Sequence, residues 1–531
     1  MQKTSVFVCL LIVLVVKHVK PNTLHLPLKI PPRVTASFME YRGGHFHGGI
    51  DFSTQQITGH PVYSLDFGTV YRIKNVDRGE GRALYLKHSN GYISVYAHLE
   101  DFSDKIKKLV PDTKIFDIYP ETRVEVKKGE HVAYSGESGA GLPHLHVEYR
   151  DTKNHPTPLV MSEFGLKDKV PPTLTKIRIV PYLASGEEHV LLPRDLNKPV
   201  EIANGPVAIQ VEGYDSFGSD PGKCGLAKIK LVLLKDEQET ILYEADFNHI
   251  DFSDRVPTAQ HFDRLRTNLS PTFYTYKLYR DSVWKSKYVK NLREEGALGV
   301  GTHNLKIRAW DYQNNMSSLA LNLVVHSGTV DRPKPYKGPL RFDSGRFILE
   351  LAQNSPSHHT SVSLNKVDTK DLTNHDLLDG VSFAPSYIWL KSVASLRYSS
   401  ELMGKEYFVR RNHHNGTWSA SGTQRHVNEL STSVSGPGEY GIKLDQRPPV
   451  IEGQRLVIRG LRLTRVMIRI YDRDSGLDRS SIRLQCNKKN MVVDWDPDRS
   501  ALEIPAGCGL ALISACDQVQ NCTERELESR H

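Results

Sequence analysis

The sequence is poor in cysteine and lacks several patterns that would assign it to a common class. Its six cysteines include no Cys-x-x-Cys pair, which disfavours a zinc ribbon. Long helical periodicities are few. Lysine and arginine are scattered rather than run together, so the net charge of +8 carries no nucleic-acid signature and only weakly favours an anionic partner. With 531 residues, 39% of them hydrophobic, the chain is long enough for three or four globular domains.

The N-terminus carries an apolar run that is too short to span a bilayer comfortably. Lys3 precedes the run, which extends from Thr4 to Val16 and has the layout of a secretory signal. No small-x-small cleavage site follows, so an uncleaved anchor remains an alternative. We therefore expect residues 1–20 to be a signal peptide or an N-terminal anchor, and the rest of the chain to be exported to the periplasm or cell envelope.

Cys9 lies inside the apolar run. Of the other five cysteines, four lie close to the C-terminus, and export would place them in an oxidising compartment. One or two disulfides are expected there, and the odd count leaves at least one free thiol. These five cysteines are Cys224, Cys486, Cys508, Cys516 and Cys522.

Short runs of Val, Ile, Leu and Tyr, broken by Gly, Pro, Asn and Asp, predict a mainly β protein. Two alternating runs flank Asn90-Gly91, which predicts a β-hairpin. Strict alternation in its second strand would place His98 on the same face as Tyr92 and Tyr96. The two tyrosines could line a substrate groove, and ordinary packing accounts for them equally well.

An internal repeat occupies the chain beyond Val170. Both copies contain Pro-Pro, then Tyr-Asp, then a last strand of pattern I-x-A-x-D-x-x-x-N that ends in a polar turn. Duplicated all-β units of this size resemble immunoglobulin-like sandwiches, although no Cys…Trp…Cys signature is present. We expect an N-terminal domain at 21–168, an immunoglobulin-like domain with an insertion at 169–330, a β-rich domain at 331–446 and a second immunoglobulin-like domain at 447–531.

Histidine pairs also occur in the third of these regions. His358-His359 and His413-His414 stand in polar contexts without Cys, Asp or Glu at ligand spacing, and we interpret both pairs as surface loops.

The N-terminal region brings histidine, aspartate and glycine together in short motifs. In "YRGGHFHGGIDFS", His47 and Asp51 stand in H-x-x-x-D spacing, and His45 competes with His47 at the wrong spacing. In "GLPHLHVEYR", strand alternation places His144, His146 and Glu148 on one face, with the two histidines roughly 6 to 7 Å apart at Cα. Each motif alone is weak, whereas their occurrence in order with "YAHL" within one β-rich domain is improbable by chance.

Together these motifs resemble the lysostaphin-type, or LytM-like, zinc metallopeptidases, many of which are peptidoglycan endopeptidases. The resemblance covers roughly residues 37–150, and the long form "SFMEYRGGHFHGGIDF" is similar to members from the Bacteroidetes group. It implies an antiparallel β-sheet peptidase domain with His47, Asp51 and His146 as zinc ligands. The family's two further active-site histidines correspond to His98 and His144. His45 and Glu148 are then expected near the site without touching the metal.

Such a ligand set leaves one tetrahedral position of Zn²⁺ for water, as catalysis requires. His144 would be the general base and His98 a hydrogen-bond donor to the oxyanion, two roles that the sequence does not separate. The expected function is a zinc-dependent metalloendopeptidase that cleaves peptide cross-links of peptidoglycan, with no nucleic-acid partner. The alternative is a non-catalytic envelope protein that binds peptidoglycan or activates another hydrolase.

Overall fold

The computed structural model describes residues 23–528 apart from short stretches at 43–44, 114, 141, 182–187, 203–206, 218–221, 237, 251–257, 264–265, 270–271, 280–288, 291–297, 328–339, 353–354, 356–361, 369–376, 385–389, 391, 400–403, 413–415, 459–462, 494, 497–498 and 506. The leader expected at residues 1–20 and the pairs His358-His359 and His413-His414 lie outside the described residues. Within the described part, no helix has the length and apolar character needed to cross a membrane.

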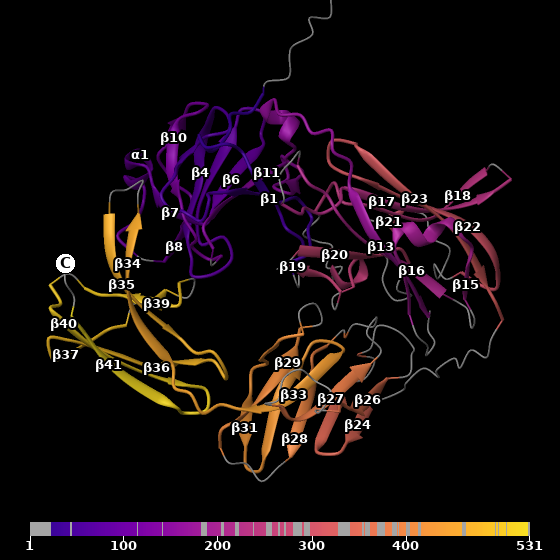
Figure 1. Ribbon diagram of the computed structural model, residues 1–531. Helices are drawn as coiled ribbons and strands as arrows, with labels where there is room; N and C mark the ends of the chain where they lie inside the picture. The colour runs from indigo at the N-terminus through magenta and orange to yellow at the C-terminus, as the bar shows by residue number, and fades with distance from the viewer. Residues whose placement is uncertain are drawn as a thin grey trace, which may run out of the picture.

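The N-terminal part of the chain, drawn in indigo and purple in Figure 1, forms two antiparallel sheets. Its elements are β1 (Val34–Ala36), β2 (Ile50–Ser53), β3 (Pro61–Tyr63), β4 (Gly68–Asn75), β5 (Arg82–His88), β6 (Ile93–Ala97), β7 (Leu99–Phe102), α1 (Asp104–Lys107), β8 (Phe116–Ile118), β9 (Glu125–Val126), β10 (His131–Ser135), β11 (His144–Arg150), β12 (Pro156–Thr157) and the 3-10 turn η1 (Met161–Phe164). The larger sheet runs β1-β2-β11-β6-β5-β4-β8, with β12 beside β11 and β9 beside β4, and the smaller runs β3-β10-β7.

The two faces of the large sheet differ in what they pack against. One face carries Leu84, Leu86 and Val147 into a core shared with Val62 and Val132 of the small sheet. Because side chains alternate along a strand, the neighbouring residues on β5, β6 and β11 project to the opposite face, which the small sheet does not cover.

The predicted hairpin is confirmed, but the expected face of His98 is wrong. Strands β5 and β6 pair around Asn90-Gly91, with Lys87 opposite Ile93. Strand β6 ends at Ala97, and His98 adopts a left-handed backbone conformation with φ of 58°, which breaks the alternation. Tyr96 is fully buried in the core, where its hydroxyl accepts a hydrogen bond from the backbone N–H of Leu65. Ordinary packing therefore accounts for Tyr96, and His98 turns to the open face.

The rest of the chain forms three pairs of sheets, which confirms the mainly β class with β-sandwich-like units downstream. The first pair contains β13 (Thr173–Pro181), β14 (His189–Leu191), η2 (Pro193–Asn197), β15 (Val200–Ile202), β16 (Val207–Tyr214), β17 (Lys228–Lys235), β18 (Gln238–Asp246), η3 (Thr258–Gln260), β19 (Asn268–Leu269), β20 (Thr272–Lys277), β21 (Val289–Lys290), β22 (Gly301–Trp310) and β23 (Met316–Val325). Sheet β14-β13-β16-β20-β19 faces sheet β15-β23-β22-β17-β18-β21 across one shared core.

The second pair of sheets has the orders β24-β25-β28-β32-β31 and β26-β27-β33-β29-β30. Its strands are β24 (Leu340–Ser344), β25 (Phe347–Leu351), β26 (Ser363–Lys366), β27 (Leu377–Ala384), β28 (Ala394–Ser399), β29 (Glu406–Arg411), β30 (Trp418–Ala420), β31 (Gln424–His426), β32 (Glu429–Val434) and β33 (Gly438–Leu444).

The third pair has the orders β34-β35-β39-β38 and β37-β36-β40-β41. Its strands are β34 (Val450–Ile458), β35 (Leu463–Tyr471), β36 (Leu477–Cys486), β37 (Lys489–Met491), β38 (Trp495–Asp496), β39 (Ala501–Glu503), β40 (Leu510–Asp517) and β41 (Cys522–Glu528). This unit holds two disulfides, Cys486–Cys508 and Cys516–Cys522, where one or two were expected, while Cys224 is buried and not disulfide-bonded. The exact boundaries of the modules stay a prediction.

The last module returns to the first domain, as Figure 1 shows for β34 and β35 below α1. Arg499 donates to the carboxylate of Glu100 at 2.8 Å and forms an ion pair with Glu137. Both carboxylate side chains are buried, with Glu100 4% and Glu137 8% exposed. One cation from the C-terminal module therefore neutralises two buried carboxylates of the N-terminal domain.

We expect Arg499→Met to release the C-terminal module from the N-terminal domain. Removal of the shared guanidinium leaves two buried carboxylates without that counter-charge, a change that costs about 3–5 kcal/mol. Small-angle X-ray scattering should show a larger radius of gyration. The matched control is Arg479→Met, since Arg479 is exposed in the same module. Unchanged scattering of Arg499→Met would contradict a role for this ion pair in docking.

Candidate metal and catalytic site

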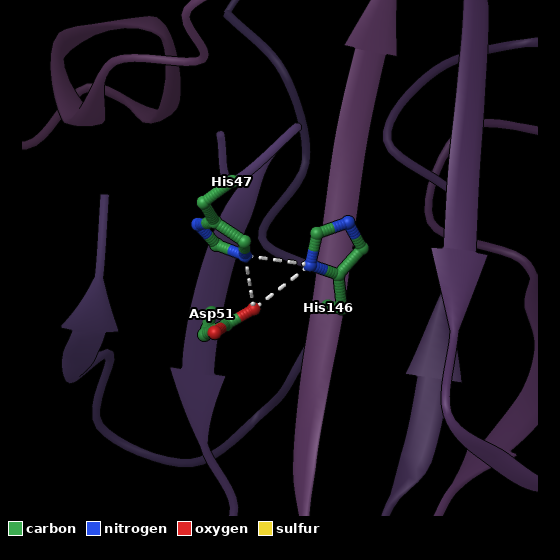
Figure 2. A group of neighbouring side chains, drawn as sticks. All are labelled: His47, Asp51 and His146. Atoms are coloured by element: carbon green, nitrogen blue, oxygen red, sulfur yellow. Dashed lines mark hydrogen bonds and ion pairs between the residues drawn. The ribbon is translucent and has the colours of Figure 1, made fainter. Parts of the chain in front are cut away.

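Three side chains on the open face of the large sheet point at one another (Figure 2). The Nε2 atom of His47 lies 3.0 Å from Oδ1 of Asp51 and 2.9 Å from Nδ1 of His146, and the latter two atoms are 2.9 Å apart. All three side chains are buried. The strands explain this convergence, because the antiparallel pairing of β2 with β11 sets Asp51 directly opposite His146.

The hydrogen bonds of the two imidazoles leave lone pairs directed into this triangle. His47 donates from Nδ1 to the backbone carbonyl of Ser37 at 2.7 Å, so its Nε2 is the unprotonated nitrogen. In its neutral form His146 donates from Nε2 to Oε1 of Glu148 at 3.1 Å, which leaves its Nδ1 unprotonated. Two neutral imidazole nitrogens and one carboxylate are the donors that Zn²⁺ prefers, with each histidine oriented by a second hydrogen bond. The residues present therefore fit a zinc ion.

Charge within the cluster also favours a cation. Burial acts to raise the pKa of Asp51, but His47 and His146 outweigh it and hold that pKa well below its usual range. Burial acts to lower the pKa of His146, whereas its hydrogen bonds to Asp51 and Glu148 and their charges raise it to about 9. The site therefore favours a positive charge. When no metal is bound, a proton on His146 supplies that charge.

The two glycines after His47 have a steric reason. A Cβ on Gly48 would lie 2.8 Å from Oε1 of Glu148, and a Cβ on Gly49 would lie 2.3 Å from the backbone oxygen of Val147. Both distances are too short for the Cβ atom that any other residue would carry. The glycines therefore let this segment cross β11 closely enough for His47 and Asp51 to reach His146.

The two further histidines lie together beside the triangle. The His98 and His144 ring centroids are 4.7 Å apart, and Nε2 of His144 lies 3.8 Å from Oδ1 of Asp51. His98 donates from Nδ1 to the carbonyl of Ser138, and His144 donates from Nδ1 to the carbonyl of Leu142. In the neutral form each ring therefore presents an unprotonated Nε2.

Both of these carbonyls belong to the glycine-rich loop between β10 and β11. The hydroxyl of Ser138 in this loop donates to the backbone oxygen of Leu99 and accepts from the N–H of Arg82. Burial lowers the pKa of His98 to about 3 and lowers the pKa of His144 in the same direction. The loop thus fixes which nitrogen of each ring can accept a proton.

A row of charged residues that the sequence motifs did not predict lies on the same face of the sheet. Glu148 pairs with Arg150, Arg150 bonds Glu80 at 3.1 Å, and Glu80 accepts from Tyr85 and Lys74. Extending the alternation of β11 by one more step beyond Glu148 would have identified Arg150. Glu148 itself lies beside the triangle, one hydrogen bond away from His146, a candidate metal ligand.

A second missed group supports the site from the neighbouring module. Arg42 donates to Oδ2 of Asp51 at 3.0 Å and lies 3.4 Å from Glu40. The buried carboxylate of Glu40 accepts from the Tyr274 hydroxyl and the Gly225 N–H of the first β-sandwich. These partners lie more than 180 residues away, so no local pattern could have identified them.

His45 and Tyr92, which were candidates from the sequence, lie outside the group of His47, Asp51 and His146. His45 is exposed, consistent with its interpretation as a loop residue. Tyr92 stacks on Tyr149 with ring centroids 5.1 Å apart, on the core side of the sheet.

Residues 45–158 match the model of Peptidase family M23. This segment is an M23 peptidase domain. The match includes His47, Asp51, His98, His144 and His146, which confirms the resemblance to the LytM-type family.

Curated relatives share the same part of the chain. An uncharacterized metalloprotease of Haemophilus influenzae is 35% identical over 116 residues, covering 22% of this chain and 21% of the relative. The DD-carboxypeptidase/endopeptidase Mpg of Neisseria meningitidis is 31% identical over 105 residues, covering 20% of each chain. The chain therefore spans about a fifth of the length of these relatives.

Among solved structures, a zinc containing peptidase from Vibrio cholerae is 26% identical, with a TM-score of 0.21 over 27% of this chain and 40% of that one.

We expect Glu148→Gln to weaken zinc binding about 10- to 100-fold, because partners that orient a metal-bound histidine contribute affinity of this size. The measurement is competition against a chromophoric zinc chelator. Glu121→Gln, an exposed substitution in the same domain, is the control and should bind zinc as the wild type does. Equal affinity of Glu148→Gln and wild type would show that Glu148 does not support His146.

Proposed function

We propose that the chain is a zinc-dependent metalloendopeptidase that, after export to the cell envelope, hydrolyses peptide cross-links of peptidoglycan. The observation that carries this proposal is the triangle of His47, Asp51 and His146 with His98 and His144 beside it. The peptidase family of residues 45–158 and the relatives described as carboxypeptidase and endopeptidase support it.

His47 Nε2, Asp51 Oδ1 and His146 Nδ1 would hold the zinc ion. When bound, zinc supplies a Lewis acid and lowers the pKa of water towards neutrality. The ligand set carries one negative charge, since both histidines are neutral when they coordinate. Ser37, Glu148 and Arg42 keep the three ligands in place through the hydrogen bonds described above.

His144 is suited to general-base catalysis. Its Nε2 is unprotonated while Nδ1 donates to Leu142, and its position beside Asp51 places it next to the ligand triangle. A lowered pKa keeps this nitrogen free to accept a proton at neutral pH.

His98 likewise donates a hydrogen bond from Nδ1 to the carbonyl of Ser138. In the neutral ring, its Nε2 can therefore accept a hydrogen bond but cannot donate one. To stabilise an oxyanion, His98 first has to take up a proton during the reaction. Its ring contact with His144 supplies a neighbour from which that proton can come.

We expect the purified chain to hold one zinc ion in this site and to release defined fragments from isolated muropeptides, identified by mass spectrometry. Asp51→Ala should lose the zinc, because a charged ligand is removed. His144→Ala should keep it and lower kcat about 10²- to 10⁴-fold, the usual contribution of a general base.

His45→Ala is the matched control, since this neighbouring histidine is exposed and outside the ligand triangle. It should retain both zinc and turnover. A zinc-loaded wild-type chain that leaves every peptidoglycan type intact would instead support a non-catalytic peptidoglycan-binding protein. Zinc retained by Asp51→Ala would reject the ligand assignment.

A further inference from the structure

Both copies of the internal repeat bring three aspartates together. The first cluster is Asp168, Asp215 and Asp311, the second is Asp445, Asp472 and Asp517, and one carboxylate oxygen of each residue lies within 4.8 Å of the others. The members come from the same three places in each copy: three residues before Pro-Pro, in the Tyr-Asp pair, and at the start of D-x-x-x-N. From the sequence alone, this last motif predicted only a polar turn.

The two clusters share a scaffold that joins the module linker to the final turn. The side-chain amide of Asn315 donates to Oδ2 of Asp311 and to the backbone oxygen of Asp168. In the second copy, Asn521 makes the same two bonds to Asp517 and Asp445. The duplication therefore preserves the placement of the three carboxylates and not merely their presence in the sequence.

In the first cluster, a buried carboxylate oxygen without a hydrogen-bond donor belongs to a residue that lines a cavity. Asp215 is 9% exposed, and its Oδ1 has no hydrogen-bond partner among the described residues. Asp168, Asp215 and Asp311 line one cavity of about 50 Å³, which has room for an ion and water. A buried anionic oxygen without a partner is costly, so this arrangement favours a bound cation.

Mutual repulsion of the carboxylates strengthens this argument. One oxygen of each carboxylate lies within 4.8 Å of the others, and Asp168, Asp215 and Asp311 are all buried, so their negative charges are poorly screened from one another. Three carboxylates at this spacing need a counter-charge to remain ionised together.

The second cluster has its own buried oxygen beside the aspartates. Asp445 and Asp517 are fully buried, and Ser475, 8% exposed, has a hydroxyl without a hydrogen-bond partner in the described part of the chain. The backbone N–H of Ser475 donates to Oδ2 of Asp445 at 3.0 Å, which places this residue at the cluster. The guanidinium of the neighbouring Arg447 is directed to Asp474 at the surface.

The type of donor indicates the class of ion. Carboxylate oxygens are hard ligands, and Ca²⁺ takes several of them at 2.3–2.6 Å in flexible geometry. Cys224 lines the first cavity, but Ser475 stands at the corresponding position before Gly-Leu in the second copy, so a thiol is not common to both. We propose that each aspartate cluster binds one Ca²⁺ ion, which joins a module to the linker that precedes it.

The location of the first cluster connects it to the peptidase domain. Its cavity is also lined by Val34, Ser37 and Ile50 of that domain, and the carbonyl of Ser37 orients His47. The second cluster lies where the third region of the chain, which ends with β33, meets β34. Calcium at these two junctions would fix the modules relative to one another, independently of whether the zinc site cleaves peptidoglycan.

The test is calorimetric titration of the full chain with CaCl₂, after calcium has been removed and with zinc kept at one equivalent to fill the histidine site. We expect two Ca²⁺ per chain with half-saturation at about 0.1 to 1 mM, the range of extracellular calcium modules. Asp215→Asn and Asp472→Asn should each bind one ion, and the double variant none.

The control is Asp236→Asn, because Asp236 is exposed at the tip of a hairpin in the same module and should leave two ions bound. Circular dichroism checks that each variant is folded. Terbium luminescence of the wild type, displaced by CaCl₂, gives a measurement that depends on no substitution. A wild-type chain that binds no calcium up to 10 mM, about tenfold above that range, or a double variant that still binds two ions, would overturn the proposal.

Discussion

The pairing of Asp51 with His146 across β2 and β11 is the constraint on which the candidate active site depends. Because side chains alternate along a strand, a slip of one residue in this register would turn either residue towards the core. The same register carries His144 and Glu148 to the face that bears the proposed metal ligands. Gly48 and Gly49 make the register possible, since any larger residue there would collide with β11.

The groups that hold the ligands extend beyond the peptidase domain. Phe38, Met39 and Tyr41 pack into the core of the first β-sandwich, and Glu40 between them bonds to that module. This short segment also provides the carbonyl of Ser37 and the guanidinium of Arg42, which contact His47 and Asp51. The peptidase domain and the first module therefore share one structural unit at the proposed zinc ligands, and a change at their interface reaches the site directly.

Local sequence patterns predicted the features that depend on neighbours in the chain. The H-x-x-x-D and H-x-H spacings identified the three residues that the fold brings together, and Asn90-Gly91 identified the hairpin. Alternation failed at His98 because this residue follows the end of β6 with a positive φ, which turns its side chain to the opposite face. The two-residue period of a strand gives no signal of such a change in backbone conformation. Tyr96 stays on the face it shares with Tyr92, as alternation predicts, and only His98 leaves that face.

Contacts between distant segments were beyond the reach of these patterns. Arg499 reaches Glu100 and Glu137 across more than 350 residues, and Tyr274 reaches Glu40 from another module. The repeat did contain the information for the aspartate clusters, because all three aspartates recur at matching places in both copies. Only the closure of each sandwich shows that these places converge, since the aspartates are far apart along the chain.

The two kinds of ion site are separated by the chemistry of their donors. Two imidazoles and one carboxylate form a compact triangle that suits a small, borderline-soft ion such as Zn²⁺. Three carboxylates in a looser group suit a larger, hard ion that accepts oxygen ligands in variable number. Calcium has little affinity for imidazole, and the aspartate clusters share no nitrogen or thiolate ligand that would favour zinc. The proposals of zinc at His47, Asp51 and His146 and of calcium at the module junctions are therefore compatible in one compartment, because selectivity resides in the ligands themselves.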